Sequence, residues 1–104
     1  MNPKPVVPRL QALRDIQVAV DFYHGEGADE AALGFVDALE RAFRHLGRFP
    51  GSGSHRHALQ LGLPDLRSWP VPRHPYLIFF LEQEEHLDVW RILHAQRDIP
   101  ASLG

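Results

Sequence analysis

Three residues near the carboxyl end of the chain carry groups that could act on a phosphodiester. Arg91, His94 and Arg97 follow one another within the stretch RILHAQRD, which ends in Asp98. An imidazole has an ordinary pKa of about 6.5, so His94 could act as a general base or acid near neutral pH. Arginine can hold a phosphate by two hydrogen bonds and stabilise developing negative charge. With Arg73 added, this set could cut RNA through its 2′-hydroxyl without a metal ion.

The same residues also have structural interpretations, which stay open at this point. Arg91 can pair with a neighbouring acid, for which Asp98 and Glu82 are the candidates. His94 at the end of a strand is more often a hydrogen-bonded structural histidine than a catalytic one. Arg97 and Asp98 can form an exposed pair within a turn, a contact that contributes about 0–1 kcal/mol.

Metal and cofactor sites are not predicted. His55 and His57 flank Arg56, but a third ligand is not evident, so we interpret this stretch as a solvated loop. The glycines at 51 and 53 follow a predicted helix and lack the spacing of a nucleotide-binding loop. The chain has no cysteine, which excludes disulfides and cysteine zinc sites.

The length and charge of the chain restrict its class. Its 104 residues predict one domain, 1–104, and its net charge is −2. Residues 41–74 carry six arginines and one acid, whereas the segments before and after are acidic. A broad nucleic-acid binder is usually basic overall. No apolar run approaches the roughly 20 residues that cross a bilayer, and the first residues lack the apolar core of a signal peptide, so we expect a cytoplasmic protein without membrane contact.

Two helices are predicted in the first half. Apolar residues recur at helical steps from Leu10 to Tyr23, and glycines then end the helix. A second helix opens near Asp29, and its apolar stripe continues to Leu46 before Pro50 and Gly51 end it. The short link between the helices predicts an antiparallel hairpin. The connection over residues 50–65 is long enough to be functional or mobile.

Strands dominate the second half. Residues 66–71, 76–82 and 87–93 read as three strands of an antiparallel meander, and Val6 and Val7 could add a short strand. The expected fold is therefore α+β, in the order β-α-α-β-β-β, with a helical hairpin on one face of a small sheet. Strict alternation would place Leu87, Val89, Arg91 and Leu93 on one face, and we expect the far face of the sheet to be partly open.

Three stretches of the sequence resemble one toxin family. DALERAFRHLGRFPGSG, LRSWPVPRHPYLIFFL and DVWRILHAQRDIP are together similar to the RelE/ParE family, and to its ParE branch of type II toxin–antitoxin systems. The similarity spans roughly residues 10 to 100. Its distinctive features are an arginine opening the second strand, an aromatic third strand, and Arg-x-x-His-x-x-Arg-Asp at the end. The resemblance implies a cytoplasmic toxin, associated with plasmid stabilisation, that is encoded beside an antitoxin.

The resemblance leaves two targets open. ParE-like toxins inhibit DNA gyrase by binding, whereas RelE-like toxins cut messenger RNA on the ribosome. A ParE-like chain would use Arg67, Arg91 and Arg97 to bind its target, and operator DNA would be reached only through a ParD-like antitoxin. A RelE-like chain would use His94, Arg91 and Arg73 as a metal-independent endoribonuclease. We expect the antitoxin to cover an apolar surface on the sheet, by helix docking and edge-strand addition. The residues expected in that surface are Trp69, Leu87, Val89 and Leu93.

Overall fold

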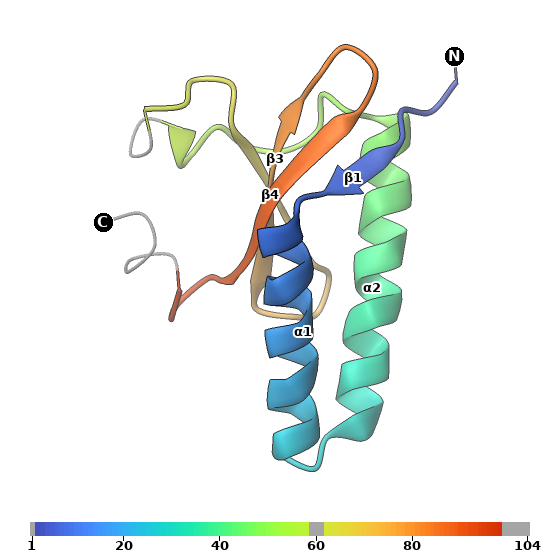
Figure 1. Ribbon diagram of the computed structural model, residues 1–104, viewed down its shortest axis with the longest axis vertical. Coiled ribbons are helices and arrows are strands. Elements are labelled where there is room, and N and C mark those ends of the chain that lie inside the picture. Colours follow the sequence, from blue (N-terminus) through green and yellow to red (C-terminus); the bar gives the residue numbers. More distant parts are fainter. Residues whose placement is uncertain (1, 59–61, 99–104) are drawn as a thin grey trace.

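The computed structural model describes residues 2–58 and 62–98, and the elements that lie wholly within these ranges include two long helices and four strands (Figure 1). The helices stand side by side as an antiparallel pair and pack against the sheet. The element order and the α+β class are those predicted from the sequence. The elements are β1 (Val6–Pro8), α1 (Leu10–Gly25), α2 (Asp29–Arg48), β2 (Arg67–Pro70), β3 (Tyr76–Glu82) and β4 (Leu87–His94).

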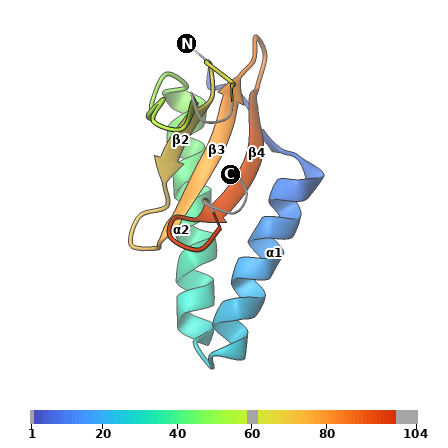
Figure 2. The ribbon, with the colours of Figure 1, turned by 90° about the vertical axis from the view of Figure 1, so that its left-hand side faces the viewer.

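The four strands form one mixed sheet in the order β1-β4-β3-β2. The last three strands make the predicted antiparallel meander, and β4 lies against its predecessor β3. The short β1 pairs in parallel with the first half of β4, from Leu87 to Val89. The second half of β4 therefore extends beyond β1, and α1 runs alongside it (Figure 2).

The main core lies between the sheet and the two helices. α2 contributes a stripe at helical spacing that includes Phe35, Leu39 and Leu46, all at most 4% exposed. The sheet contributes residues of β3 and β4 that are completely buried, among them Ile78 and Phe80. Full burial of such side chains contributes about 1.5–3 kcal/mol each, so this layer supplies most of the stability of the fold.

A β-bulge at Trp90 changes the faces of β4. Phe79 pairs with Arg91 while Phe80 pairs with Val89, so β4 has one extra residue at this point. The alternation therefore reverses: Val89 and Ile92 face the helices, whereas Leu93 belongs to a different cluster. The expectation that Leu87, Val89 and Leu93 share one face is wrong for this reason.

The far face of the sheet is also partly covered. Leu66, Phe79 and Leu93 form a second buried cluster there, each at most 2% exposed, and Leu77 and Leu81 pack against it. The connection before β2 supplies part of the cover, because Leu63 joins the cluster and the His57 ring lies edge-on to Phe79 at 5.4 Å. The chain itself therefore covers part of the sheet face that we expected to be open.

The edges of the sheet carry backbone groups that already have partners. Directly before β2, the Leu66 N–H donates to Leu63 O. On β2 itself, Ser68 exchanges two hydrogen bonds with Ser54, and Pro70 has no N–H. On β4, beyond β1, carboxylates accept from the backbone, which pairs Ile92 N with Asp15 at 3.0 Å and His94 N with Asp98 at 2.8 Å. A strand added along β2, or along this part of β4, would have to displace these bonds.

Candidate functional site

Arg91 is held by Asp15 of α1 in a two-point contact. Its Nε lies 2.8 Å from Asp15 Oδ2 and its Nη2 lies 3.0 Å from Oδ1. The Asp15 side chain is 10% exposed and the Arg91 side chain is 34% exposed. The hydrogen bonds to Asp15 raise the pKa of the Arg91 guanidinium despite its partial burial. An ion pair at Arg91 was among the predicted alternatives, but its partner is Asp15 rather than Asp98 or Glu82.

His94 has a structural hydrogen-bonding role at the end of β4. Its Nδ1 accepts hydrogen bonds from the backbone N–H groups of Gln96 and Arg97, both at 3.2 Å. Burial lowers the pKa of His94, the charge of Arg97 acts in the same direction, and Asp98 opposes them. The neutral imidazole is the form that can accept at Nδ1, so the fold favours it.

Arg97 contacts the Phe22 ring and the Tyr76 hydroxyl rather than its neighbour Asp98. Its Nη2 is 3.2 Å from the Tyr76 hydroxyl, and its guanidinium carbon is 4.7 Å from the centre of the Phe22 ring. Burial raises the pKa of Tyr76, which keeps the hydroxyl protonated at neutral pH. The predicted local pair of Arg97 with Asp98 is replaced by these contacts, since Asp98 caps the His94 backbone.

The other two candidate arginines lie in different surroundings. Arg67 reaches Glu82 at 3.5 Å, and Glu82 also binds Lys4 at 2.8 Å, a contact that lowers the pKa of Glu82. Arg73 is exposed in the turn between β2 and β3, with φ at 67°. Within residues 2–58 and 62–98, no hydrogen bond or ion pair joins the Arg73 side chain to His94 or Arg91. The structure therefore does not assemble the three candidate nuclease residues through direct contacts.

The four residues expected to bind an antitoxin are not an exposed apolar patch. Leu87 and Val89 are completely buried under the helices, and Leu93 is 2% exposed in the cluster on the far face. Trp69 packs on the helix side, where its ring stacks on His45 of α2 at 4.7 Å. A partner could reach Leu87 or Val89 only if the helical layer moved away.

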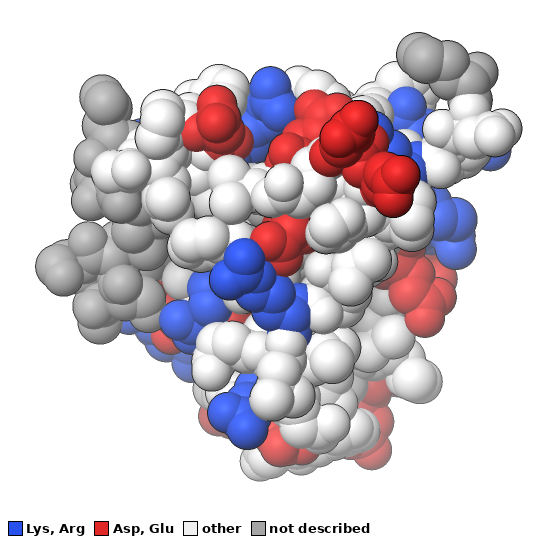
Figure 3. All heavy atoms as spheres, turned by 45° about the horizontal axis from the view of Figure 1, so that its top comes forward, with Lys and Arg blue, Asp and Glu red and all other residues white. Residues whose placement is uncertain are grey.

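Charges on the surface are mixed. On the face shown in Figure 3, basic and acidic side chains of the described residues lie interspersed, without a broad area of one sign. Among these residues no cluster of three or more histidines or acids is placed to bind a metal ion. No helix in the described part of the chain is long and apolar enough to cross a membrane.

Sequence reasoning missed the residues that hold the candidate site in place. Asp15 is separated from Arg91 by 76 positions. Phe22 comes from the same helix as Asp15, and Tyr76 comes from β3. A weak signal did exist, because Asp15 is an acid within the predicted first helix. Its partner could be found only once the packing of α1 beside β4 was known.

The family of the chain follows from comparison with known proteins. A family model described as the ParE toxin of the type II toxin–antitoxin system, parDE, matches residues 6–99. The chain therefore belongs to the ParE toxin family.

Structural comparison agrees at the level of the fold. The chain is similar to a solved structure described as the chromosomal ParDE TA system from P. aeruginosa, with a TM-score of 0.74 and 19% sequence identity. The match covers 89% of this chain and 97% of that chain. No curated protein matches the sequence.

Proposed function

We propose that the chain is a ParE-like toxin that inhibits DNA gyrase by binding it, and that a cognate ParD-like antitoxin neutralises it in the cytoplasm. Membership of the ParE family supports the toxin–antitoxin part of this proposal. The choice of gyrase over messenger RNA rests on the geometry around the end of β4.

The hydrogen bonding of His94 is the observation that supports gyrase over messenger RNA as the target. A general base for RNA cleavage needs an accessible nitrogen directed at the 2′-hydroxyl. In this chain Nδ1 already accepts from two backbone N–H groups. Arg91 is bound at two points to Asp15, and Arg73 lies in a separate turn. The contacts of His94 and Arg91 stabilise the fold, and they are not contacts that catalysis would need.

Target binding is proposed for Arg97, Arg91 and Arg67, with Arg97 in the leading role. Arg97 is exposed, and its guanidinium is oriented by Phe22 and Tyr76, so little conformational freedom is lost when a carboxylate binds it. Arg91 and Arg67 are partly buried in ion pairs and would contribute only their remaining exposed N–H groups.

The two targets are separated by one induction experiment. The chain is expressed alone from a tight promoter, and plasmid supercoiling, DNA breaks and mRNA integrity are measured in the same culture. Inhibition of gyrase predicts growth arrest with altered supercoiling or gyrase-dependent DNA breaks, while the mRNA stays intact. Arrest with codon-phased mRNA cuts and unchanged DNA would refute the proposal.

A ribosome-dependent endoribonuclease remains the second candidate. It is favoured by one observation, the grouping of His94 and Arg97 around Tyr76, whose ring lies 5.3 Å from the imidazole. Under this alternative His94→Ala abolishes mRNA cuts, whereas the gyrase proposal predicts that His94→Ala still arrests growth if the variant folds. Circular dichroism of the purified variant with its antitoxin checks folding.

A further inference from the structure

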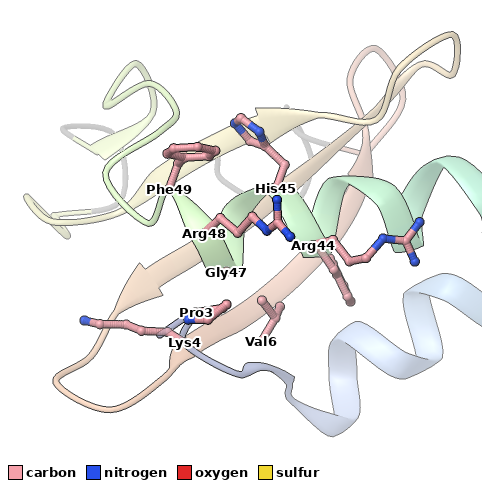
Figure 4. A pocket seen from close by; sticks show the side chains of 9 residues that line it. Pro3, Lys4, Val6, Arg44, His45, Gly47, Arg48 and Phe49 are labelled. Atoms are coloured by element: carbon pink, nitrogen blue, oxygen red, sulfur yellow. The ribbon is translucent and has the colours of Figure 1, made fainter. Parts of the chain in front are cut away.

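An open groove of about 670 Å³ crosses the last turns of α2, where the amino-terminal arm, residues 2–5, leads past the helix into β1 (Figure 4). We call it the α2–arm groove. Its lining combines cationic, aromatic and aliphatic side chains. The lining residues from the arm and β1 are Pro3, Lys4 and Val6, and those from α2 and the position after it are Phe43, Arg44, His45, Gly47, Arg48 and Phe49.

The wall of the groove is fixed by a close approach at Gly47. Lys4 N donates to Gly47 O at 2.9 Å, and a Cβ at position 47 would lie 2.8 Å from the Lys4 carbonyl oxygen. Only glycine allows the backbone of the arm to lie this close to the helix without a shift. The side chain of Lys4 is directed to Glu82 at 2.8 Å. The arm is therefore tied down at two points.

The groove exposes an aromatic ring whose position is set by its neighbours. Phe49 is 58% exposed, and its ring lies 5.2 Å from that of His45. His45 in turn stacks on Trp69 and lies 3.2 Å from the Ser52 hydroxyl. An exposed phenylalanine held in this way offers apolar area to a partner at a low entropic cost.

Two cations of the groove have no acidic partner within the described residues. Arg41, one turn earlier, pairs with Asp37 at 2.7 Å, whereas no carboxylate there lies within ion-pairing distance of Arg44 or Arg48. In Figure 4, Arg48 lies between Phe49 and His45 on one side and the arm on the other. Cations are common at the carboxyl end of a helix because they complement its dipole. That preference does not account for an exposed aromatic ring beside them.

We propose that the α2–arm groove binds an acidic, amphipathic segment of a partner protein. Apolar side chains of the segment cover Phe49 and Val6, and its carboxylates bind the guanidinium groups of Arg44 and Arg48 by paired hydrogen bonds. The inference rests on the proposed function, in which the antitoxin is such a partner. It places the docking surface at the end of α2, away from the buried sheet residues Leu87 and Val89.

The test uses a phage library of random peptides of about 16 residues, long enough for roughly four helical turns. The library is panned on the intact chain, and the enriched clones are sequenced and measured by biolayer interferometry. We expect binders rich in Asp and Glu that also carry apolar residues. A selection that yields no binders, or binders without an acidic bias, would overturn the proposal.

Two double variants with equal changes in net charge localise the binding. Arg44→Glu with Arg48→Glu should weaken the selected peptides by about tenfold or more, since it replaces attraction with repulsion. The matched control, Arg14→Glu with Arg56→Glu, changes two exposed arginines outside the groove and should leave affinity within about twofold. Basic versions of the peptides should bind the first variant better than the original chain. Equal weakening by both variants would contradict the site.

Failure of this inference can be told apart from failure of the proposed function. Peptide binding is measured on the purified chain and does not depend on toxicity. Growth arrest with no groove-dependent binders would support the toxin assignment and refute the groove as a binding site. Groove-dependent binders without growth arrest would support the groove as a binding site and refute the proposed toxin activity. Thermal unfolding of both double variants shows whether either has lost its fold.

Discussion

Arg9 and Asp88 face each other through two parallel hydrogen bonds, from Nε to Oδ1 at 2.9 Å and from Nη2 to Oδ2 at 2.7 Å. Arg9 directly precedes α1, and Asp88 lies in β4, so the contact joins the start of the helix to the sheet. The Trp90 side chain completes it, with Nε1 3.3 Å from Asp88 Oδ2 and the Arg9 guanidinium 4.6 Å from the ring centre.

The Arg9–Asp88 contact predicts a dependence of stability on pH. The hydrogen bond from Arg9 lowers the pKa of Asp88 below its ordinary value of about 3.9, which the unfolded chain retains. The stabilisation is thus complete above that value and is lost as pH falls through the folded pKa. Urea unfolding should show Asp88→Asn about 1 kcal/mol less stable than the original chain at pH 7, with the difference shrinking toward pH 3. A difference that is constant with pH would contradict the assignment.

Removing Arg91 should destabilise the fold through Asp15. Arg91→Ala leaves a largely buried carboxylate whose remaining hydrogen-bond partner among the described residues is the Ile92 N–H, so we expect a loss of about 1–3 kcal/mol in the free energy of unfolding. Arg73→Ala, at an exposed turn position, should change stability by no more than about 0.5 kcal/mol. A double-mutant cycle with Asp15→Asn should give a coupling of about 1 kcal/mol or more, and additive effects would show that the two side chains act independently.

Two glycines of α2 should respond in opposite directions to alanine. At Gly34 a new Cβ would meet only the His74 ring, at 3.9 Å, so Gly34→Ala should stabilise the chain by about 0.5–1 kcal/mol. At Gly47 the new Cβ would collide with the Lys4 carbonyl, so Gly47→Ala should destabilise by about 1–2 kcal/mol. Denaturant unfolding of both variants measures the contrast. Equal stabilisation at both sites would mean that the arm does not lie against the helix.

The pKa of His94 should lie below the ordinary value of about 6.5 for histidine. Burial lowers its folded pKa, so the unfolded chain takes up a proton first, at about pH 6.5. The contribution of this residue to stability is therefore fully present above that pH and is lost as pH falls through the folded pKa. An NMR titration of the imidazole measures the shift, and a His94 pKa above 6.5 would contradict the neutral acceptor described above.

The fold was predictable where patterns are local. β3 was predicted residue for residue, because Tyr76–Glu82 is apolar on both faces and is bounded by turn residues. The faces of β4 were mispredicted, since a period of two carries no sign of the extra residue at Trp90. The sequence predicted that Arg91 could form an ion pair, but it did not identify the acidic partner. Asp15 comes from another element, and only tertiary packing brings the two together.

The backbone groups at the edges of the sheet affect whether two copies of the chain can associate edge to edge. Ser54 pairs with the outer side of β2 and Pro70 ends that strand, Pro8 ends β1, and Asp15 and Asp98 bind the backbone in the uncovered part of β4. Within the part of the chain that the structure describes, these borders offer no run of vacant amides on which a second molecule could extend the ladder. We therefore expect copies of the chain not to associate edge to edge at high concentration, and we expect its complexes to form through side chains rather than through shared backbone hydrogen bonds.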